Sequence, residues 1–264
     1  YYYGARYLDP TGTTWLSVDP LFEKYVGMSP YNYCAGNPLV YRDPDGRIIM
    51  IIVGEESFQY NPNSTNNYTG INEVITKSIS ELNKMNSVHQ GNIVLDVLSN
   101  SNISYILRSN TSALSNGYIA TKGTETDFGG QIELNHFAHE LFHHYQRENG
   151  QGGPTYFNEI EAYTFEREII LDYMGNNNYD GESFTSYEST RFVVEDLSSE
   201  CQEYEDAASN IIVNGTFNRE KFEKSVQLFK NCSGANGTGL YNQSQYKERK
   251  GNERYLLESL YPQE

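Results

Sequence analysis

The spacing of the histidines near the middle of the chain constrains the fold more than any other feature. Four of the five histidines lie within the nine residues His136–His144, and two of them, His139 and His143, enclose Glu140 in the order His-Glu-x-x-His (HExxH). Residues four apart on an α-helix differ by about 40° around its axis, so both imidazoles face one side and can share a metal ion. Glu140 lies about a quarter turn away, within reach of a water at that ion. The spacing therefore predicts a helix that carries two metal ligands and a nearby carboxylate.

A catalytic zinc ion also needs a third protein ligand and one open coordination position. Glu159 lies sixteen residues after His143, and the intervening segment 149–154, Asn-Gly-Gln-Gly-Gly-Pro, consists of turn-forming residues. We expect this loop to end the first helix and reverse the chain. A second helix over about 155–174 would then run antiparallel to the first, with Glu159 near its beginning and facing the histidines.

Together these strings resemble the gluzincin branch of the zincin metallopeptidases. In that branch, HExxH is followed by a second helix with a ligand Glu in a pattern such as ExxxD or ExEAD, and the matching string here is Glu159-Ile160-Glu161-Ala162-Tyr163. The resemblance implies Zn²⁺ as the cofactor and Glu140 as the general base, with three metal ligands: His139, His143 and Glu159. Several gluzincins have an Asp that hydrogen-bonds a ligand histidine where this chain has Tyr163, so that role is either altered or moved elsewhere.

Other residues near the motif compete with these ligands or support them. Glu161 is the competing third ligand and Glu166 a more distant one; only one of Glu159 and Glu161 can face the metal, because they differ by about 200° around a helix. The motif alignment favours Glu159. His136 lies on the ligand face, one turn earlier on the helix, and we expect it to support the site rather than bind the metal. His144 points about 100° away from His143 and is expected to be a packing or rim residue.

These residues predict a zinc-dependent metallopeptidase, an enzyme that hydrolyses peptide bonds. Glu140 would activate a zinc-bound water for attack on the peptide carbonyl and then deliver the proton to the leaving nitrogen. Two alternatives stay open. The first is a zincin-like amidase that acts on cell-wall peptide, and the second is a non-enzymatic interaction domain whose histidine cluster is structural.

Residues 1–47 differ in character from the rest of the chain. They hold eight of the 23 tyrosines together with Asp-Pro, Asn-Pro and Asp-Gly pairs, which is typical of aromatic-rich hairpins. They resemble, nearly word for word, the end of the core domain of Rhs/YD-repeat proteins, and the matching signatures are Tyr3-Gly4-Ala5-Arg6-Tyr7, Trp15-Leu16-Ser17 and Asp43-Pro44-Asp45-Gly46. In that family the repeats build a β-shell around a variable C-terminal toxin. The resemblance implies two domains: 1–47 as the end of the Rhs repeat-associated core and 48–264 as a polymorphic toxin domain.

The Rhs resemblance carries further expectations about processing and partners. It implies self-cleavage near Arg47 by an aspartyl pair, Asp19 and Asp43, although Arg47 replaces the usual Leu; the alternative is that these Asp-Pro units only form turns. It also implies an upstream Rhs shell, a secretion apparatus and a cognate immunity protein as partners. The chain would be a secreted or injected effector, delivered from a bacterium into a target cell.

Charge and hydropathy limit the class of function. The formal charge is −16, and residues 1–47 hold four basic and five acidic side chains, so −15 belongs to 48–264. A surface of this sign argues against nucleic-acid binding and permits a peptidase with a protein or peptide substrate. The longest apolar run, Ile48–Val53, suits a buried strand and is too short for a membrane span.

Apolar periodicity predicts an α+β fold, and the motifs make it a zincin-like one. We expect strands over 47–54, 102–108 and 117–121, and helices over 71–86, near 187–212 and over 217–230, besides the two motif helices. Segment 93–98 is a short helix or strand. Polar loops are expected from the first strand to about 69 and over 121–130, and the end, 234–264, is expected to be polar and partly loop. Strand 117–121 would border the cleft with an open edge that can pair with a substrate backbone.

Overall fold

The fold was analysed in a computed structural model, which describes residues 8–9, 14–17, 31, 49–101, 103–109, 119–176, 199–235 and 254–262. The mixture of helices and strands in these residues confirms the predicted α+β class. The predicted aspartyl pair, Asp19 and Asp43, the domain junction near 47 and the expected helix over 187–198 lie outside the described residues. Two short strands within residues 1–47, β1 (Leu8–Asp9) and β2 (Thr14–Trp15), pair antiparallel.

A five-stranded mixed sheet forms the first layer after residue 48, in the order β4-β3-β5-β7-β6. Its strands are β3 (Ile49–Val53), β4 (Glu56–Tyr60), β5 (Tyr105–Arg108), β6 (Ala120–Lys122) and β7 (Glu125–Asp127). The central pairs β3–β5 and β5–β7 are parallel, whereas the outer strands β4 and β6 pair antiparallel with their neighbours. The expected loops before 69 and over 121–130 were therefore wrong where they contain β4 and β7. Strand β6 lies at one edge of the sheet.

Two helices form the crossover that the parallel pair β3–β5 requires. They are α1 (Glu73–Ser87) and α2 (His89–Ser99), so the ambiguous segment 93–98 is helical. Helix α1 begins two residues later than predicted, because the Asn72 side chain accepts hydrogen bonds from the N–H groups of Val74 and Ile75 and caps the helix. Ile75, Ile79, Leu82 and Met85 follow helical spacing and are buried.

The two motif helices are α3 (Leu134–Glu148) and α4 (Tyr156–Asn176), close to their predicted extents. The earlier residue of α3, His139, contacts the later residue of α4, Glu166, whereas the later residue of α3, His143, contacts the earlier residue of α4, Glu159. The helices are therefore antiparallel, as predicted. The chain reverses through Gly150 and Gly153, whose φ angles of 77° and 129° disfavour a side chain.

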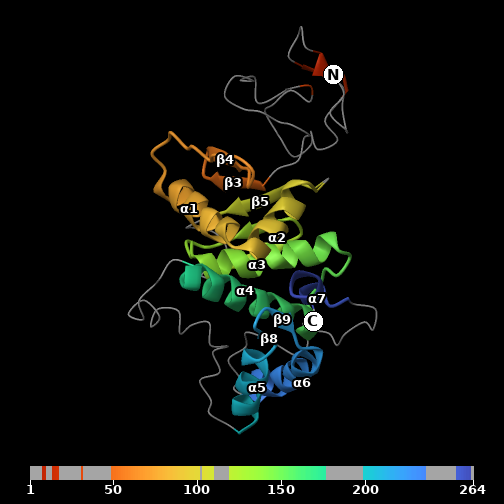
Figure 1. Cartoon of the computed structure of the whole chain (residues 1–264). Helices are drawn as coiled ribbons and strands as arrows, with labels where there is room; N and C mark the ends of the chain where they lie inside the picture. Colours follow the sequence, from red (N-terminus) through yellow and green to blue (C-terminus); the bar gives the residue numbers. More distant parts are fainter. Residues whose placement is uncertain are drawn as a thin grey trace.

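Helix α4 lies between α3 and a C-terminal layer, so its apolar residues are buried around most of its circumference. This layer contains α5 (Ser199–Ser209), β8 (Ile212–Val213), β9 (Thr216–Phe217), α6 (Arg219–Ala235) and α7 (Leu256–Leu260). Helix α7 lies in the segment that was expected to be polar and partly loop, for which no helix was predicted. Figure 1 shows the succession of sheet, α3, α4 and C-terminal helices. None of the helices in the described residues is long and apolar enough to cross a bilayer.

Candidate metal centre

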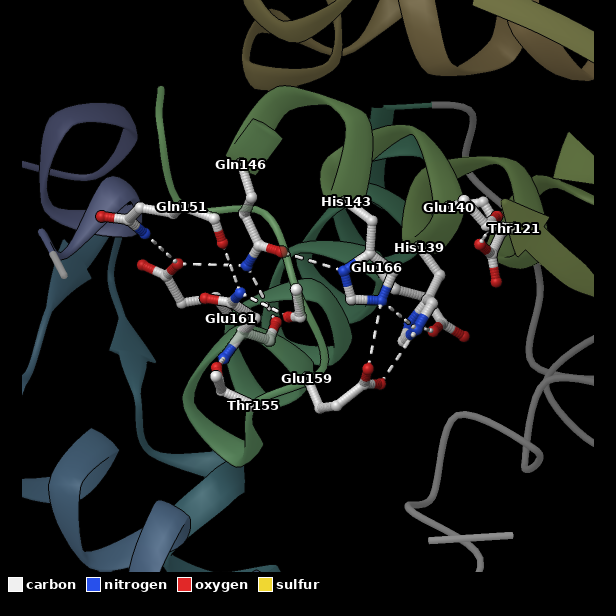
Figure 2. Close-up of polar contacts among 12 residues, drawn as sticks. Thr121, His139, Glu140, His143, Gln146, Gln151, Thr155, Glu159, Glu161 and Glu166 are labelled. Carbon is white, nitrogen blue, oxygen red and sulfur yellow. Dashed lines mark hydrogen bonds and ion pairs between the residues drawn. The ribbon is translucent and has the colours of Figure 1, made fainter. Parts of the chain in front are cut away.

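Three side chains from α3 and α4 converge on one point, and they are the three predicted metal ligands. The Nε2 atoms of His139 and His143 are 3.1 Å apart. The Glu159 carboxylate reaches both of them, with Oε2 3.6 Å from His139 Nε2 and Oε1 3.5 Å from His143 Nε2. Figure 2 shows the carboxylate facing the two rings from the neighbouring helix. This group of two imidazoles and one carboxylate could hold a metal ion.

The spacing of these donor atoms fits a zinc ion. Ligands at about 2.0–2.1 Å in tetrahedral geometry lie about 3.3 Å from one another. The two imidazole nitrogens are 3.1 Å apart, and each lies 3.5 or 3.6 Å from one of the two oxygens of the Glu159 carboxylate, which is close to that value. The side chains of His139, His143 and Glu159 are 12%, 21% and 9% exposed, so the group is largely shielded from water but open on one side. Two imidazoles and a carboxylate with a fourth position open are a donor set typical of catalytic zinc.

Hydrogen bonds behind the histidines fix their tautomers. His139 Nδ1 lies 3.1 Å from Glu166 Oε2, and His143 Nδ1 lies 2.9 Å from Gln146 Oε1. Both partner atoms accept, so each ring donates from Nδ1 and leaves the lone pair of Nε2 for a cation. Partners of this kind orient histidine ligands and raise their basicity. The carboxylate that contacts Nδ1 of His139 in this chain is therefore that of Glu166.

Neither Glu166 nor Gln146 was predicted in these roles, although helical spacing could have suggested both. Glu166 follows Glu159 by seven residues, which places it two turns along the same face of α4, and Gln146 follows His143 by three on α3. Tyr163, at the position where several gluzincins have Asp and a possible supporting residue in the sequence, packs its ring on His139, with 4.4 Å between the centroids. His136, the other expected supporting residue, lies 3.1 Å through Nδ1 from the carbonyl of Gln131.

The two remaining candidates from the sequence point away from the ligand group. Glu161 is fully buried and accepts hydrogen bonds from the Gln146 side chain and from the backbone of α7. His144 is also fully buried, and its ring packs against Tyr105 of β5 at a centroid distance of 4.7 Å. The prediction that only one of Glu159 and Glu161 faces the histidines thus agrees with the geometry.

Glu140 is bound to the edge of the sheet through a line of hydroxyls. The Thr121 hydroxyl of β6 donates to Glu140 Oε2. Because the Thr121 hydroxyl donates its proton to Glu140, its oxygen accepts a hydrogen bond from the Thr126 hydroxyl of β7, with 2.7 Å between the two Oγ1 atoms. Thr126 then accepts from Nε2–H of His144 at 3.0 Å. The general-base candidate is therefore anchored to two adjacent strands, a contact that the sequence motif did not predict.

The electrostatics of the group favour a cation. Burial lowers the pKa of His139, but hydrogen bonds with Glu159 and Glu166 and the charge of Glu140 outweigh it and raise the pKa to about 10. The His143 pKa is also raised, because the charge and hydrogen bond of Glu159 outweigh burial. The Glu159 pKa is held well below its usual range: burial would raise it, but the charge of His143 and hydrogen bonds with both histidines dominate. The negative charge of these carboxylates, which stabilises protonated histidines, also favours a divalent metal ion at the same place.

A cavity of about 850 Å³ opens in front of the ligand group. It is bounded by β6, by α3 and by the loop between α3 and α4, and its walls include Ile119, Thr121, Gln131, Glu133, His136, Glu140, Arg147, Gly153, Pro154 and Tyr163. Because β6 is an edge strand and Thr121 lines the cavity, the predicted strand at 117–121 borders the cleft in its described part. A cavity of this size can enclose a segment of peptide.

Comparison with known proteins finds a partial likeness to a toxin. The chain is 32% identical over 91 residues to the toxin subunit YenC2 of Yersinia entomophaga. The match covers 34% of this chain and 8% of that protein, so the chain spans less than a tenth of its relative's length. No protein-family model matches the chain, and no solved structure matches it. About one third of the chain is therefore similar to a toxin subunit.

Proposed function

We propose that residues 48–264 form a zinc-dependent metallopeptidase that acts as a toxin. The observation that carries the proposal is the convergence of His139, His143 and Glu159 at zinc-ligand spacing beside Glu140, in the wall of a large cavity. When bound, zinc supplies a Lewis acid that polarises a carbonyl and lowers the pKa of water. The zincin-like classification rests on the motif spacing and on the order of the edge strand and the two antiparallel helices.

Each residue of the group has a distinct task in this mechanism. His139, His143 and Glu159 hold the ion, while Glu166 and Gln146 keep the Nδ1 protons on the two rings, so that both Nε2 atoms are free to bind. Glu140, held by Thr121, takes the proton of the attacking water on its carboxylate and delivers it to the leaving amide nitrogen. The ligand side chains are only 9–21% exposed, and this partial burial strengthens the charge interactions.

The likeness to a toxin subunit and the Rhs-like residues 1–47 support the biological context of the proposal. The chain would be the C-terminal part of an Rhs-type protein that is secreted or injected into a target cell. Its partners would be the upstream Rhs shell, a secretion apparatus and an immunity protein that protects the producing cell. Its substrate would be a protein or peptide; amide bonds of cell-wall peptide are the second candidate.

The test is to measure zinc content and peptide hydrolysis on the same purified samples. Wild-type protein should hold one zinc ion per chain, and His139→Ala should lose both the ion and hydrolysis. Glu140→Gln should keep the ion but lose hydrolysis, since the carboxylate moves the proton without holding the metal. His136→Ala is the matched control, because His136 lines the same cavity outside the ligand group, and it should keep the ion. Wild-type protein that binds no zinc, or Glu140→Gln with undiminished hydrolysis, would refute the proposal.

A further inference from the structure

Glu161 is a fully buried carboxylate whose partners come from two distant parts of the chain. Its Oε1 accepts from the backbone N–H groups of Leu256, at 2.7 Å, and Leu257, at 3.4 Å. Its Oε2 accepts from the side-chain amides of Gln146, at 3.1 Å, and Gln151, at 3.4 Å. A buried charge is stable only with such partners, so the carboxylate holds the start of α7 and the end of α3 together.

Gln146 connects this carboxylate to a metal ligand. Its Nε2 group donates to Glu161 and, at 2.8 Å, to the backbone carbonyl of Asn158. Both contacts require donors, so the amide can adopt only one orientation, with Oε1 toward His143 Nδ1 at 2.9 Å. That oxygen keeps the proton of His143 on Nδ1. Figure 2 shows the continuous line from Glu161 through Gln146 to His143.

The segment 254–262 supplies the other end of the line. Leu256, Leu257, Leu260 and Tyr261 are buried, and the segment is also held by Gln151, whose side chain accepts from the Arg254 N–H. When this segment is docked, Oε1 of Glu161 accepts hydrogen bonds from the backbone of α7, and these bonds fix the orientation of the carboxylate. The Gln146 amide is then held with its oxygen, Oε1, toward His143. Docking of the C-terminal segment and presentation of a metal ligand are therefore joined through two buried side chains.

We propose that Glu161 is a positioning residue that couples docking of segment 254–262 to metal binding by His143. The inference rests on the metal centre of the proposed function but not on peptide hydrolysis. Coupling of two equilibria is reciprocal, so a bound ion stabilises the docked segment by the same factor by which docking strengthens metal binding. Residues that orient a ligand histidine typically change metal affinity by about 10–100-fold.

The first test measures the dissociation constant for Zn²⁺ by competition with a chromophoric chelator in the full chain. Glu161→Gln replaces an acceptor with an amide that presents a donor to Gln146, so affinity should fall by about 10–100-fold. Gln146→Met should cause a similar loss. The double variant should be no weaker than the weaker single variant, because Glu161 acts through Gln146. Glu81→Gln changes a buried carboxylate of α1, which is paired with Lys84, and should leave the zinc affinity within about twofold.

A second pair of variants decides the question if Glu161→Gln does not fold. Leu256→Pro removes the N–H that Glu161 accepts at the first position of α7, where proline is tolerated, and Leu256→Ala removes the side chain but keeps the N–H. Zinc should bind more weakly to Leu256→Pro than to Leu256→Ala, because only the proline variant lacks the N–H. In the wild type, bound zinc should slow hydrogen exchange of the Leu257 amide. The factor should equal the one by which docking of segment 254–262 strengthens zinc binding.

The outcomes separate this proposal from the metal centre itself. If wild-type protein binds no zinc, or His139→Ala binds it equally well, both proposals fail. Suppose instead that wild type binds zinc through His139, while folded Glu161→Gln and Leu256→Pro bind it as tightly as their controls. The metal centre then stands and the coupling is overturned. Additive losses in the Glu161 and Gln146 double variant would also overturn it, because they would show independent structural effects.

Discussion

At the scale of single residues, the site is defined as much by the groups behind the ligands as by the ligands themselves. The motif predicted His139, Glu140 and His143 from helical spacing alone; the structure brings the two histidines together with Glu159 and places Glu140 in the wall of the same cavity. Glu166 and Gln146 could not be assigned in the same way, because a hydrogen bond to one ring nitrogen depends on the rotation of α4 against α3. Helical spacing limits such partners to a few positions, and tertiary packing selects among them.

Thr121 provides a test of how Glu140 is held. Thr121→Val removes the hydroxyl that donates to Glu140 but keeps the shape of the side chain. Loss of a hydrogen bond to a charged group costs about 1.5–3 kcal/mol, so hydrolysis should slow by about tenfold or more. Zinc content should not change, because Thr121 contacts no ligand of the group. Thr124→Val, in the turn between β6 and β7, is the matched control; equal rates in the two variants would contradict this role of Thr121.

The raised pKa of His139 predicts that zinc and protons compete for the site. With a pKa of about 10, His139 is protonated in the metal-free protein at pH 7, and an ion bound at Nε2 displaces that proton. Apparent zinc affinity should therefore rise with pH from 7 toward about 10 and fall as the solution is acidified. Calorimetric titration in two buffers of different ionisation enthalpy measures the released proton. Heats that do not depend on the buffer would show that His139 is neutral before zinc binds.

At the scale of elements, the pair α3 and α4 was predictable because its signals are local. The apolar spacing, the histidine pair and the glycine-rich segment 149–154 are all visible within a short stretch of chain. Strand β4 and helix α7 were missed for the opposite reason. Two of the five residues of β4 are exposed and only one is buried, so the strand depends on its pairing with β3. The five residues of α7 are fixed by a distant carboxylate, Glu161.

The loop between α3 and α4 has a backbone requirement that can be measured. At both Gly150 and Gly153, a Cβ would meet no atom within 4 Å, so only backbone strain opposes alanine. Gly150→Ala, with a φ of 77° near the left-handed region, should destabilise the fold by about 1 kcal/mol. Gly153→Ala, with a φ of 129°, should cost about 2–3 kcal/mol. Denaturant unfolding gives both values, and a larger loss at Gly150 would contradict the difference in backbone strain.

The packing of α3 on the sheet makes the fold sensitive to acid through His144. Burial lowers the pKa of His144 to about 3, so the folded protein keeps this ring neutral where the unfolded chain protonates it. The resulting stability is complete above about pH 6.5 and is lost as the pH falls toward 3. At pH 4.5 the loss is at most about 2–3 kcal/mol, since each unit costs about 1.4 kcal/mol.

Unfolding of wild type and His144→Gln between pH 7 and 4.5 tests this dependence. The variant should lose less stability over the range than the wild type, because it has no imidazole to protonate. His136→Gln changes a partly exposed histidine of the same helix and serves as the control. If wild type and His144→Gln show the same pH dependence, His144 contributes nothing to acid sensitivity.

At the scale of the whole molecule, two separate parts of the chain support one account from independent observations. The metal centre comes from the packing of α3 against α4, whereas the toxin context comes from the Rhs-like residues 1–47 and the likeness to a toxin subunit. The net charge of −16 is compatible with a hydrolase of proteins and unfavourable for a nuclease. The overall α+β class was predictable from periodicity, whereas the order of strands depends on long-range pairing.

The most direct test of the central claim is to map new protein N-termini in an extract of target cells. Zinc-loaded wild-type protein and Glu140→Gln are added to matched samples, and the N-termini are identified by mass spectrometry. We predict a set of cleavage sites that appears with wild type and is absent with Glu140→Gln, although both proteins hold one zinc ion. Identical N-termini in the two samples, at equal zinc content, would contradict the account of this chain as a metallopeptidase.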